Sequence, residues 1–175
     1  MELDIHADIV AGKSLGGIQL LSEVGSYWSL LREEKSKLQL DYHQGEIHTV
    51  VYALKSKFME INVDVRTGLI YKVSALPGYA GNFLGWIKIG TPMPEVWEAE
   101  LDFDYDDAEM GFFSARFPGI SLEPDIIDPL EEDFPSLTVG AITIADPEYI
   151  KKANAAAAGR MSWEDFKKHF CQDET

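Results

Sequence analysis

Two short stretches of the chain, GKSLGGIQL at residues 12–20 and GNFLGWIKI at residues 81–89, share one pattern of residues. Glycine, leucine, glycine and isoleucine recur at the same offsets, and both stretches end on an aliphatic residue. The first glycine of each stretch permits a tight backbone entry. The last aliphatic residues alternate with a period of two, as on one face of a strand. We therefore predict one unit twice, a glycine turn and a short strand followed by a helix.

A Glu-Val pair follows each stretch, at residues 23–24 and 95–96, and the second spacing is three residues longer. We expect a helix at each pair. Ser22 precedes the first helix and is predicted to cap it. Thr91 is predicted to cap the second helix, with Pro92 at its first helical position.

Between and after these units, the sequence predicts strands joined by short turns. The predicted strands are residues 37–42, 47–54, 58–65, 69–76, 99–105, 111–117 and 137–144. Residues 43–46 are typical of a hairpin turn, and residues 119–136, rich in proline and acid, predict an ordered loop. Such short connections favour an antiparallel meander.

Two helices are predicted near the C-terminal end. Asp146 and Pro147 begin the first, which stops at Gly159, and Ser162 caps the second. Segregated hairpins and few helices indicate the α+β class, with a largely antiparallel sheet or sheets, rather than a doubly wound parallel sheet.

The length of 175 residues fits one domain, and the 46% of hydrophobic residues can bury a sizeable core. We expect a single domain over residues 1–175. Its two related halves are predicted at about residues 1–78 and 79–145, followed by C-terminal helices at residues 146–171.

The chain is strongly acidic, with 30 Asp and Glu against 15 Lys and Arg and a net charge of −15. Nucleic-acid binders need a positive footprint, and anionic membranes repel such a chain, so neither direct nucleic-acid nor membrane binding is expected. The start, MELDIHADIV, lacks the basic residues of a secretory signal. The single cysteine, Cys171, cannot form an internal disulfide. We expect a cytoplasmic protein.

Two motif-like patterns lack residues that their chemistry needs. A phosphate-binding loop around residues 13–14 requires glycine where Ala7 stands. A calcium loop starting with DFDYD at residues 102–106 requires glycine and glutamate where Asp107 and Phe113 stand. The alternating acids of that stretch favour a strand whose carboxylates share the solvent face.

The histidines and the cysteine do not form a catalytic or metal-binding constellation. His43 and His48 flank the predicted turn, but no cysteine or well-spaced carboxylate completes a ligand set. The serines lack the Gly-x-Ser-x-Gly context of a nucleophile elbow. We therefore expect no catalytic residue, no metal and no cofactor.

The concentration of acids in one segment is the remaining candidate for a functional feature. Residues 98–133 hold thirteen acids against one base, Arg116, a net charge of −12. This segment is either a solvated face that keeps the chain soluble or a recognition surface for a cationic protein. The candidate partner-binding residues are Asp102, Asp104, Asp106, Asp107, Glu109, Glu123, Asp125, Asp128, Glu131, Glu132 and Asp133.

The doubled Gly-x-x-Leu-Gly-x-Ile-x-[Leu/Ile] stretch followed by a Glu-Val helix resembles small bacterial immunity proteins of contact-dependent growth inhibition and other polymorphic toxin systems. The resemblance covers about a fifth of the chain. It implies a cytoplasmic protein that binds one cognate toxin domain and blocks it, and it carries over no catalytic residue. Many such toxins are nucleases with basic substrate grooves.

Physical reasoning agrees with that implication. A nuclease groove collects positive charge to hold phosphates, so carboxylates presented by this chain would occupy it. Long-range attraction would speed encounter, and apolar anchors would slow release. The leading hypothesis is a non-enzymatic immunity protein. Two alternatives stay open: a small hydrolase with paired carboxylates in a concave pocket, and an adaptor or structural domain with a broad apolar patch.

Overall fold

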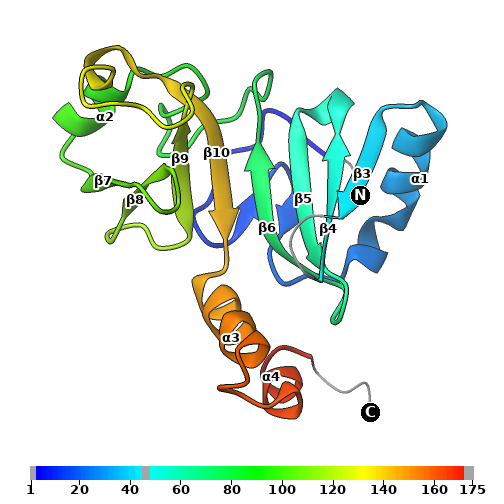
Figure 1. The fold of residues 1–175 in the computed structure, drawn as a ribbon. Coiled ribbons are helices and arrows are strands. Elements are labelled where there is room, and N and C mark those ends of the chain that lie inside the picture. The colour runs from blue at the N-terminus through cyan, green and yellow to red at the C-terminus, as the bar shows by residue number, and fades with distance from the viewer. Residues whose placement is uncertain (1–2, 45–47, 172–175) are drawn as a thin grey trace.

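The computed structural model describes residues 3–44 and 48–171, and one large sheet organises them (Figure 1). All pairings in this sheet are antiparallel. Its strands, in spatial order, are β3 (Leu40–Gln44), β4 (Thr49–Leu54), β5 (Met59–Asp64), β6 (Leu69–Ala75), β10 (Val139–Ala145), β9 (Ile120–Pro124), β8 (Gly111–Ser114) and β7 (Phe103–Asp106). The two predicted halves therefore share one sheet and meet where β6 pairs with β10.

Short hairpins and helices accompany the sheet, which confirms the predicted α+β class. These elements are β1 (Ser14–Leu15), β2 (Ile18–Gln19), η1 (Val24–Tyr27), α1 (Trp28–Ser36), η2 (Lys55–Lys57), α2 (Met93–Glu98), η3 (Phe134–Ser136), α3 (Pro147–Ala157) and α4 (Trp163–Phe170). The C-terminal helices α3 and α4 lie together at one end of the sheet (Figure 1). Within residues 3–44 and 48–171, no helix has the length and apolar character needed to cross a membrane.

The two halves repeat the same backbone hydrogen bonds at a constant offset of 69 residues (90 − 21, 93 − 24 and 139 − 70). In the first half, the N–H groups of Leu21, Val24 and Ile70 donate to the carbonyls of Ile70, Gly68 and Ser22 at 2.7, 2.9 and 3.0 Å. In the second half, Gly90, Met93 and Val139 donate to Val139, Leu137 and Thr91 at 2.7, 2.8 and 2.9 Å. The offset makes Pro92 the counterpart of Glu23, so the two Glu-Val pairs are not equivalent.

Both predicted hydroxyl caps are wrong. Ser22 Oγ donates to the carbonyl of Gln19 at 2.6 Å, and η1 and α1 have no side-chain cap. Thr91 Oγ1 accepts from the N–H of Lys88 at 3.0 Å, and Pro92 is the N-cap of α2. Each hydroxyl instead forms a hydrogen bond with the backbone three residues earlier, before the helix begins.

One face of the sheet forms the main core. Ile61, Val73, Ile144 and Ile120 lie directly opposite one another across β5, β6, β10 and β9, and all four are buried. Burying each such side chain contributes about 1.5–3 kcal/mol. The residues that cover this row come from β1, β2, η1, α1 and α2 and from the segment before α2: Leu15, Ile18, Tyr27, Leu31, Ile87, Met93 and Val96.

The opposite face is polar. Glu60, Ser74, Thr143 and Ser121 form the corresponding row across the same four strands. The hydroxyls of Ser74 and Thr143 lie 2.8 Å apart, and Thr143 donates to Glu123 Oε1 at 2.6 Å. These bonds satisfy hydroxyls that are buried at the junction of the two halves.

Several strand boundaries differ from the predictions. The segment 119–136 is not one loop, because β9 begins at Ile120 and fills the place between β8 and β10. At the start of the sheet, α1 continues to Ser36 and β3 begins only at Leu40. The predicted turn at 43–46 lies partly outside the described residues, since Gln44 ends β3 and residues 45–47 are not described.

The C-terminal helices begin where predicted. Asp146 Oδ1 accepts from the N–H of Tyr149 at 2.7 Å and caps α3, which has Pro147 in its first turn. Ser162 Oγ accepts from the N–H of Asp165 at 3.1 Å and caps α4. Side-chain caps of this kind stabilise a helix by about 1 kcal/mol.

Candidate functional site

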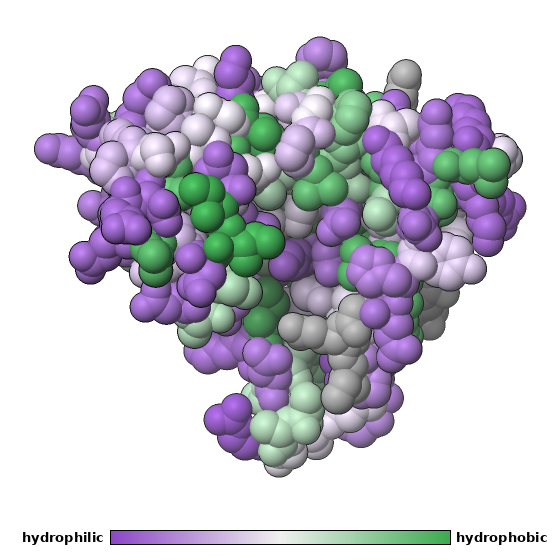
Figure 2. Space-filling model, turned by 45° about the horizontal axis from the view of Figure 1, so that its top comes forward, coloured by the Kyte–Doolittle hydropathy of each residue, from purple (hydrophilic) through white to green (hydrophobic). Residues whose placement is uncertain are grey.

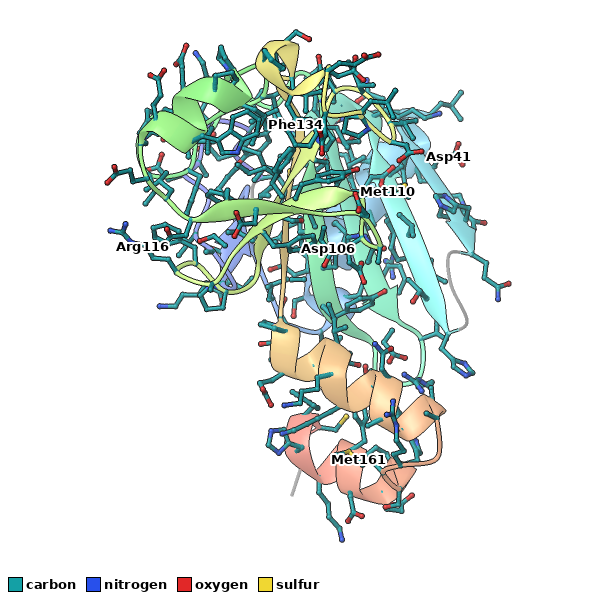
Figure 3. All side chains as sticks on the ribbon, turned by 60° about the vertical axis from the view of Figure 1, so that its left-hand side comes forward. Asp41, Asp106, Met110, Arg116, Phe134 and Met161 are labelled. Atoms are coloured by element: carbon teal, nitrogen blue, oxygen red, sulfur yellow. The ribbon has the colours of Figure 1, made fainter. Side chains whose placement is uncertain are left out.

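An aromatic cluster joins the β9–β10 connection to the outer strands of the second half. Phe134 lies in that connection, and its ring centroid is 5.7 Å from Tyr105 in β7 and 6.0 Å from Phe112 in β8. Trp97 of α2 stacks on Phe134 at 5.8 Å. Figure 3 shows Phe134 over the β7–β8 pair, in which Asp106 ends β7 and Met110 lies in the connecting turn. The cluster therefore places the β9–β10 connection beside that turn.

The eleven predicted acids lie on these two segments, and we call them together the acidic surface. Asp102, Asp104, Asp106, Asp107 and Glu109 belong to β7 and its flanks, whereas Glu123, Asp125, Asp128, Glu131, Glu132 and Asp133 belong to β9 and the β9–β10 connection. Only Glu123 and Asp133 are half-buried, and the other nine acids are exposed. The acids of β7 and of the β9–β10 connection thus lie around the same edge of the sheet.

Tyr105 lies close to acids of both segments. Its hydroxyl is buried and has no hydrogen-bond partner among the described residues. Burial raises the pKa of Tyr105, and the charges of Asp128 and Asp107 raise it further. One of these acids comes from each segment, so both carboxylates act on the same hydroxyl.

Three acids of the surface shape their own loops. Asp106 Oδ1 accepts from two backbone N–H groups of the β7–β8 turn, at 2.9 and 3.1 Å. Asp125 Oδ1 accepts from the N–H of Thr138 at 2.9 Å, and Asp133 Oδ2 accepts from the N–H of Leu130 at 2.9 Å. These bonds give the loops a defined shape.

No acid of this surface takes part in any of the five ion pairs found among the described residues. The charge of residues 98–133 is therefore not neutralised by internal lysines or arginines. Crowded like charges raise the energy of the compact state and attract an oppositely charged molecule.

Apolar side chains stand exposed among these acids. In the β9–β10 connection, 88% of Ile127 and 62% of Leu130 is exposed. The others are Met110, Phe113 and Ile126. Figure 2 shows hydrophobic side chains gathered among hydrophilic ones on the side of the molecule where β7 and β8 lie. Exposed apolar groups rimmed by polar ones mark interaction surfaces.

A second feature lies on the polar face of the sheet. A cleft of about 600 Å³ is lined by Asn62, Asp64, Tyr71 and Lys72 of the first half, by Tyr149 and its neighbours on α3, and by Glu109 from the β7–β8 turn. Glu109 is the one predicted acid among its lining residues. No local pattern in the sequence indicates this cleft, because its walls come from segments far apart in the chain.

Asp64 anchors α3 to the β5–β6 turn beside this cleft. Arg66 binds its carboxylate with Nε at 2.9 Å and Nη2 at 2.6 Å, and the Tyr149 hydroxyl donates to it at 3.1 Å. Burial works to raise the pKa of Asp64, but the hydrogen bonds and charge of Arg66 outweigh burial and lower it. Burial raises the pKa of Tyr149. The carboxylate is thus charged and engaged by its neighbours.

The glycine of the phosphate-loop candidate and two of the histidines make contacts elsewhere in the fold. Gly12 donates from its N–H to the carbonyl of Gly119 at 3.1 Å, which ties the first hairpin to the β8–β9 turn. His48 lines the cleft, and His169 contacts Lys152. Across residues 3–44 and 48–171, no three His, Cys, Asp or Glu side chains gather as a metal-ion site.

Comparisons with known proteins bear on the fold. No family model matches the chain, and no curated protein sequence matches it. Among solved structures, the crystal structure of the uncharacterized protein yfeY from Escherichia coli is similar, with a TM-score of 0.50 and 15% sequence identity. The similarity covers 78% of this chain and 98% of that one. At this identity, the chain and yfeY share an architecture, and the comparison carries no function.

Proposed function

We propose that the chain is a non-enzymatic binding protein that holds a cationic protein against its acidic surface, as an immunity protein holds its toxin. One observation carries the proposal. Nine exposed carboxylates of two adjoining segments lie outside every ion pair of the described residues and surround exposed apolar side chains. A face kept only for solubility has no need of exposed isoleucine and leucine in its midst.

The two kinds of side chain have separate tasks in this proposal. The carboxylates attract a cationic partner over long range and speed its association, with an effect that salt weakens. The apolar side chains lose their contact with water in the complex and slow its dissociation. Ile127 and Leu130 are the most exposed of these anchors.

The finer parts of the proposal concern the partner and the compartment. The partner is a toxin domain with a basic groove for nucleic acid, and the two proteins meet in the bacterial cytoplasm. Carboxylates in such a groove take the place of phosphates and exclude the substrate without any reaction. The cleft gives less support to a hydrolase with paired carboxylates, since Asp64 is already bound by Arg66 and Tyr149.

The test uses the purified product of the upstream neighbouring reading frame and measures its binding kinetics at low and high salt. The wild-type chain is expected to form a stoichiometric complex whose association slows as salt rises. The Asp128→Asn/Glu131→Gln variant should weaken binding by about 10–100-fold, since close charge pairs across interfaces are worth about 1.5 kcal/mol or more. Ile127→Ser should mainly speed dissociation.

A matched control removes the same charge elsewhere. Asp8→Asn/Glu23→Gln alters two exposed acids of the first half that take part in no ion pair among the described residues. This variant should change the affinity by less than about three-fold at moderate salt, because distant charges are screened. An absence of complex at low salt would overturn the proposal, and so would equal losses in the two double variants.

A further inference from the structure

A small groove in the first half differs in character from the rest of the surface. It has a volume of about 220 Å³ and lies between α1, the edge strand β3 and its neighbour β4. Its lining residues are Trp28, Leu31, Arg32, Lys35, Leu40, Tyr42 and Tyr52. Two aromatic walls stand open to solvent, with Trp28 43% and Tyr42 56% exposed. The groove is thus aromatic and aliphatic inside, with two cations beside it.

The two cations, Arg32 and Lys35, have no acid of their own. They lie one turn apart on α1, and neither takes part in an ion pair among the described residues. Lys35 Nζ lies 5.0 Å from the centroid of the Tyr42 ring. The neighbouring acids are engaged elsewhere, in the contacts Glu33–Lys37, Glu34–Ser56 and Asp41–Lys55. In a chain with twice as many acids as bases, this unpaired cationic rim favours an anionic occupant.

The same chain presents a segment of the complementary chemistry at its other end. Residues 125–132, DIIDPLEE, combine exposed acids with exposed aliphatic side chains, of which Ile127 is the most exposed. The groove adjoins β3 at one edge of the sheet, whereas this segment lies beside β7 at the other edge (Figure 1). A chain therefore cannot fill its own groove, but a second copy can.

We propose that the α1 groove accepts residues 125–132 of a second copy, so that the chain associates head to tail. Ile127 enters the aromatic groove, and Asp125 and Asp128 face Arg32 and Lys35. The contact joins two different surfaces, so each association leaves one free groove and one free segment, and the assembly grows with concentration. This contact does not depend on the cationic partner proposed above. That partner would compete for the same segment and limit the assembly.

Sedimentation of the full chain, without any partner, tests the proposal. At moderate salt, which screens the repulsion between copies of net charge −15, the weight-average mass should rise with concentration from the 19.6 kDa of one chain to at least twice that value. At high salt it should fall back toward one chain, because salt screens the charge contacts. A mass of one chain at every concentration in moderate salt overturns the proposal.

Two variants then identify the surfaces. Arg32→Gln/Lys35→Gln disables the groove, and Ile127→Asp disables the segment. Each variant alone should remain a single chain, because each lacks one of the two surfaces. An equal mixture should form a dimer and stop there, since only one intact groove and one intact segment can meet. Circular dichroism of each variant verifies that it is folded.

The control Lys13→Gln/Lys88→Gln removes two exposed cations away from the groove and should associate as the wild type does. Association that persists in either surface variant alone overturns the proposal, since the contact then uses another part of the chain. A mixture that fails to form the dimer overturns it as well. None of these results involves the cationic partner, so a failure here leaves the proposed function standing.

Discussion

The two halves of the molecule share one frame, by which we mean the repeated backbone hydrogen bonds and the buried row across the sheet. They differ in the connection between two of their strands. The first half joins β5 to β6 through residues 65–68, whereas the second joins β9 to β10 through residues 125–138. The short turn is covered by α3 and α4, and the long connection is exposed and acidic. Residues 1–78 hold ten acids and eight bases, while residues 79–145 hold fourteen acids and two bases.

This difference separates what folds the chain from what distinguishes its surface. The repeated hydrogen bonds and the buried row across the sheet occur in both halves, so they belong to the frame. The concentration of charge occurs only in the half whose connection is long and uncovered. We infer that the frame sets the fold and that the unequal connections carry the interactions.

The largest expected effect comes from uncovering the short turn. Tyr149 is buried, stacks on Tyr71 at 5.7 Å between ring centroids and lies 4.7 Å from Phe170. Tyr149→Ala should lower the free energy of unfolding by about 3–5 kcal/mol, because it leaves a large cavity beneath the C-terminal helices. Urea unfolding measures the loss.

The control is Tyr149→Phe, which keeps the ring and removes a hydroxyl that bonds to Thr67 at 2.8 Å and to Asp64 at 3.1 Å. It should cost about 1 kcal/mol. If both substitutions cost the same, packing of the ring does not hold the helices on the turn, and the contrast between the connections loses its basis.

The second effect concerns the ion pair of the short turn. Asp64→Asn should cost about 2 kcal/mol at neutral pH, because Arg66 loses charge-assisted hydrogen bonds in a largely buried place. The pKa of Asp64 is lowered in the folded chain, so its contribution is complete above the ordinary carboxyl pKa of about 4. The contribution disappears as the pH falls through the lowered value.

Urea unfolding of the wild type and Asp64→Asn across acidic pH measures this effect, and the two curves should converge toward low pH. Asp41→Asn is the matched control, since Asp41 pairs with Lys55 at 3.4 Å between largely exposed side chains. It should cost less than about 1 kcal/mol. A difference between wild type and Asp64→Asn that stays constant down to low pH would contradict the charge argument.

Local signals predicted much of the fold. The start of α3 at Asp146 and the cap of α4 at Ser162 could be predicted because a helix start depends on its immediate neighbours. Ser22 and Thr91 show the limit of that reasoning, since each hydroxyl has a backbone partner in the preceding hairpin. The strand beginning at Ile120 was missed because the proline and acid around it favour a loop.

Long-range contacts account for the rest. Nothing local indicates that β6 pairs with β10, because that pairing joins segments about 70 residues apart in the chain. For the same reason, the cleft and the bond of Tyr149 to Asp64, 85 residues away in sequence, lay beyond sequence reasoning. The acidic surface could be predicted because its residues gather along the chain itself. Its role in binding stays a prediction.

A smaller effect tests the equivalence of the two hairpins. Gly16 and Gly85 are 69 residues apart, and both have a left-handed backbone, with φ values of 62° and 80°. An alanine Cβ at Gly85 would meet nothing within 4 Å, whereas at Gly16 it would lie 2.7 Å from Met59 Sδ. Gly85→Ala should cost about 1 kcal/mol through backbone strain alone. Gly16→Ala should cost several tenths of a kcal/mol more, since the flexible Met59 must move.

Thermal and urea unfolding of the two alanine variants give this comparison directly. A negligible cost in both variants would show that the left-handed positions do not constrain the hairpins. A larger cost for Gly85→Ala than for Gly16→Ala would reverse the expected order and remove the packing argument.

The smallest expected effect decides whether the acids of the long connection belong to the frame. Asp128→Asn/Glu131→Gln removes two exposed charges that lie outside every ion pair of the described residues. Stability should change by less than about 0.5 kcal/mol, and upward, because like charges repel less. Asp125→Ala is the contrasting variant, since it removes the Oδ1 that accepts from the N–H of Thr138, and it should cost about 0.5–1 kcal/mol. Urea unfolding at low salt measures both.

A loss of more than about 1 kcal/mol in the double variant would mean that these carboxylates hold the connection in place. The two halves would then differ in how they are built and not in what they bind. A small gain in stability would mean that these carboxylates do not hold the connection in place. Acids that weaken the folded state slightly, in a connection that the frame does not need, are what the proposed contact outside the chain predicts.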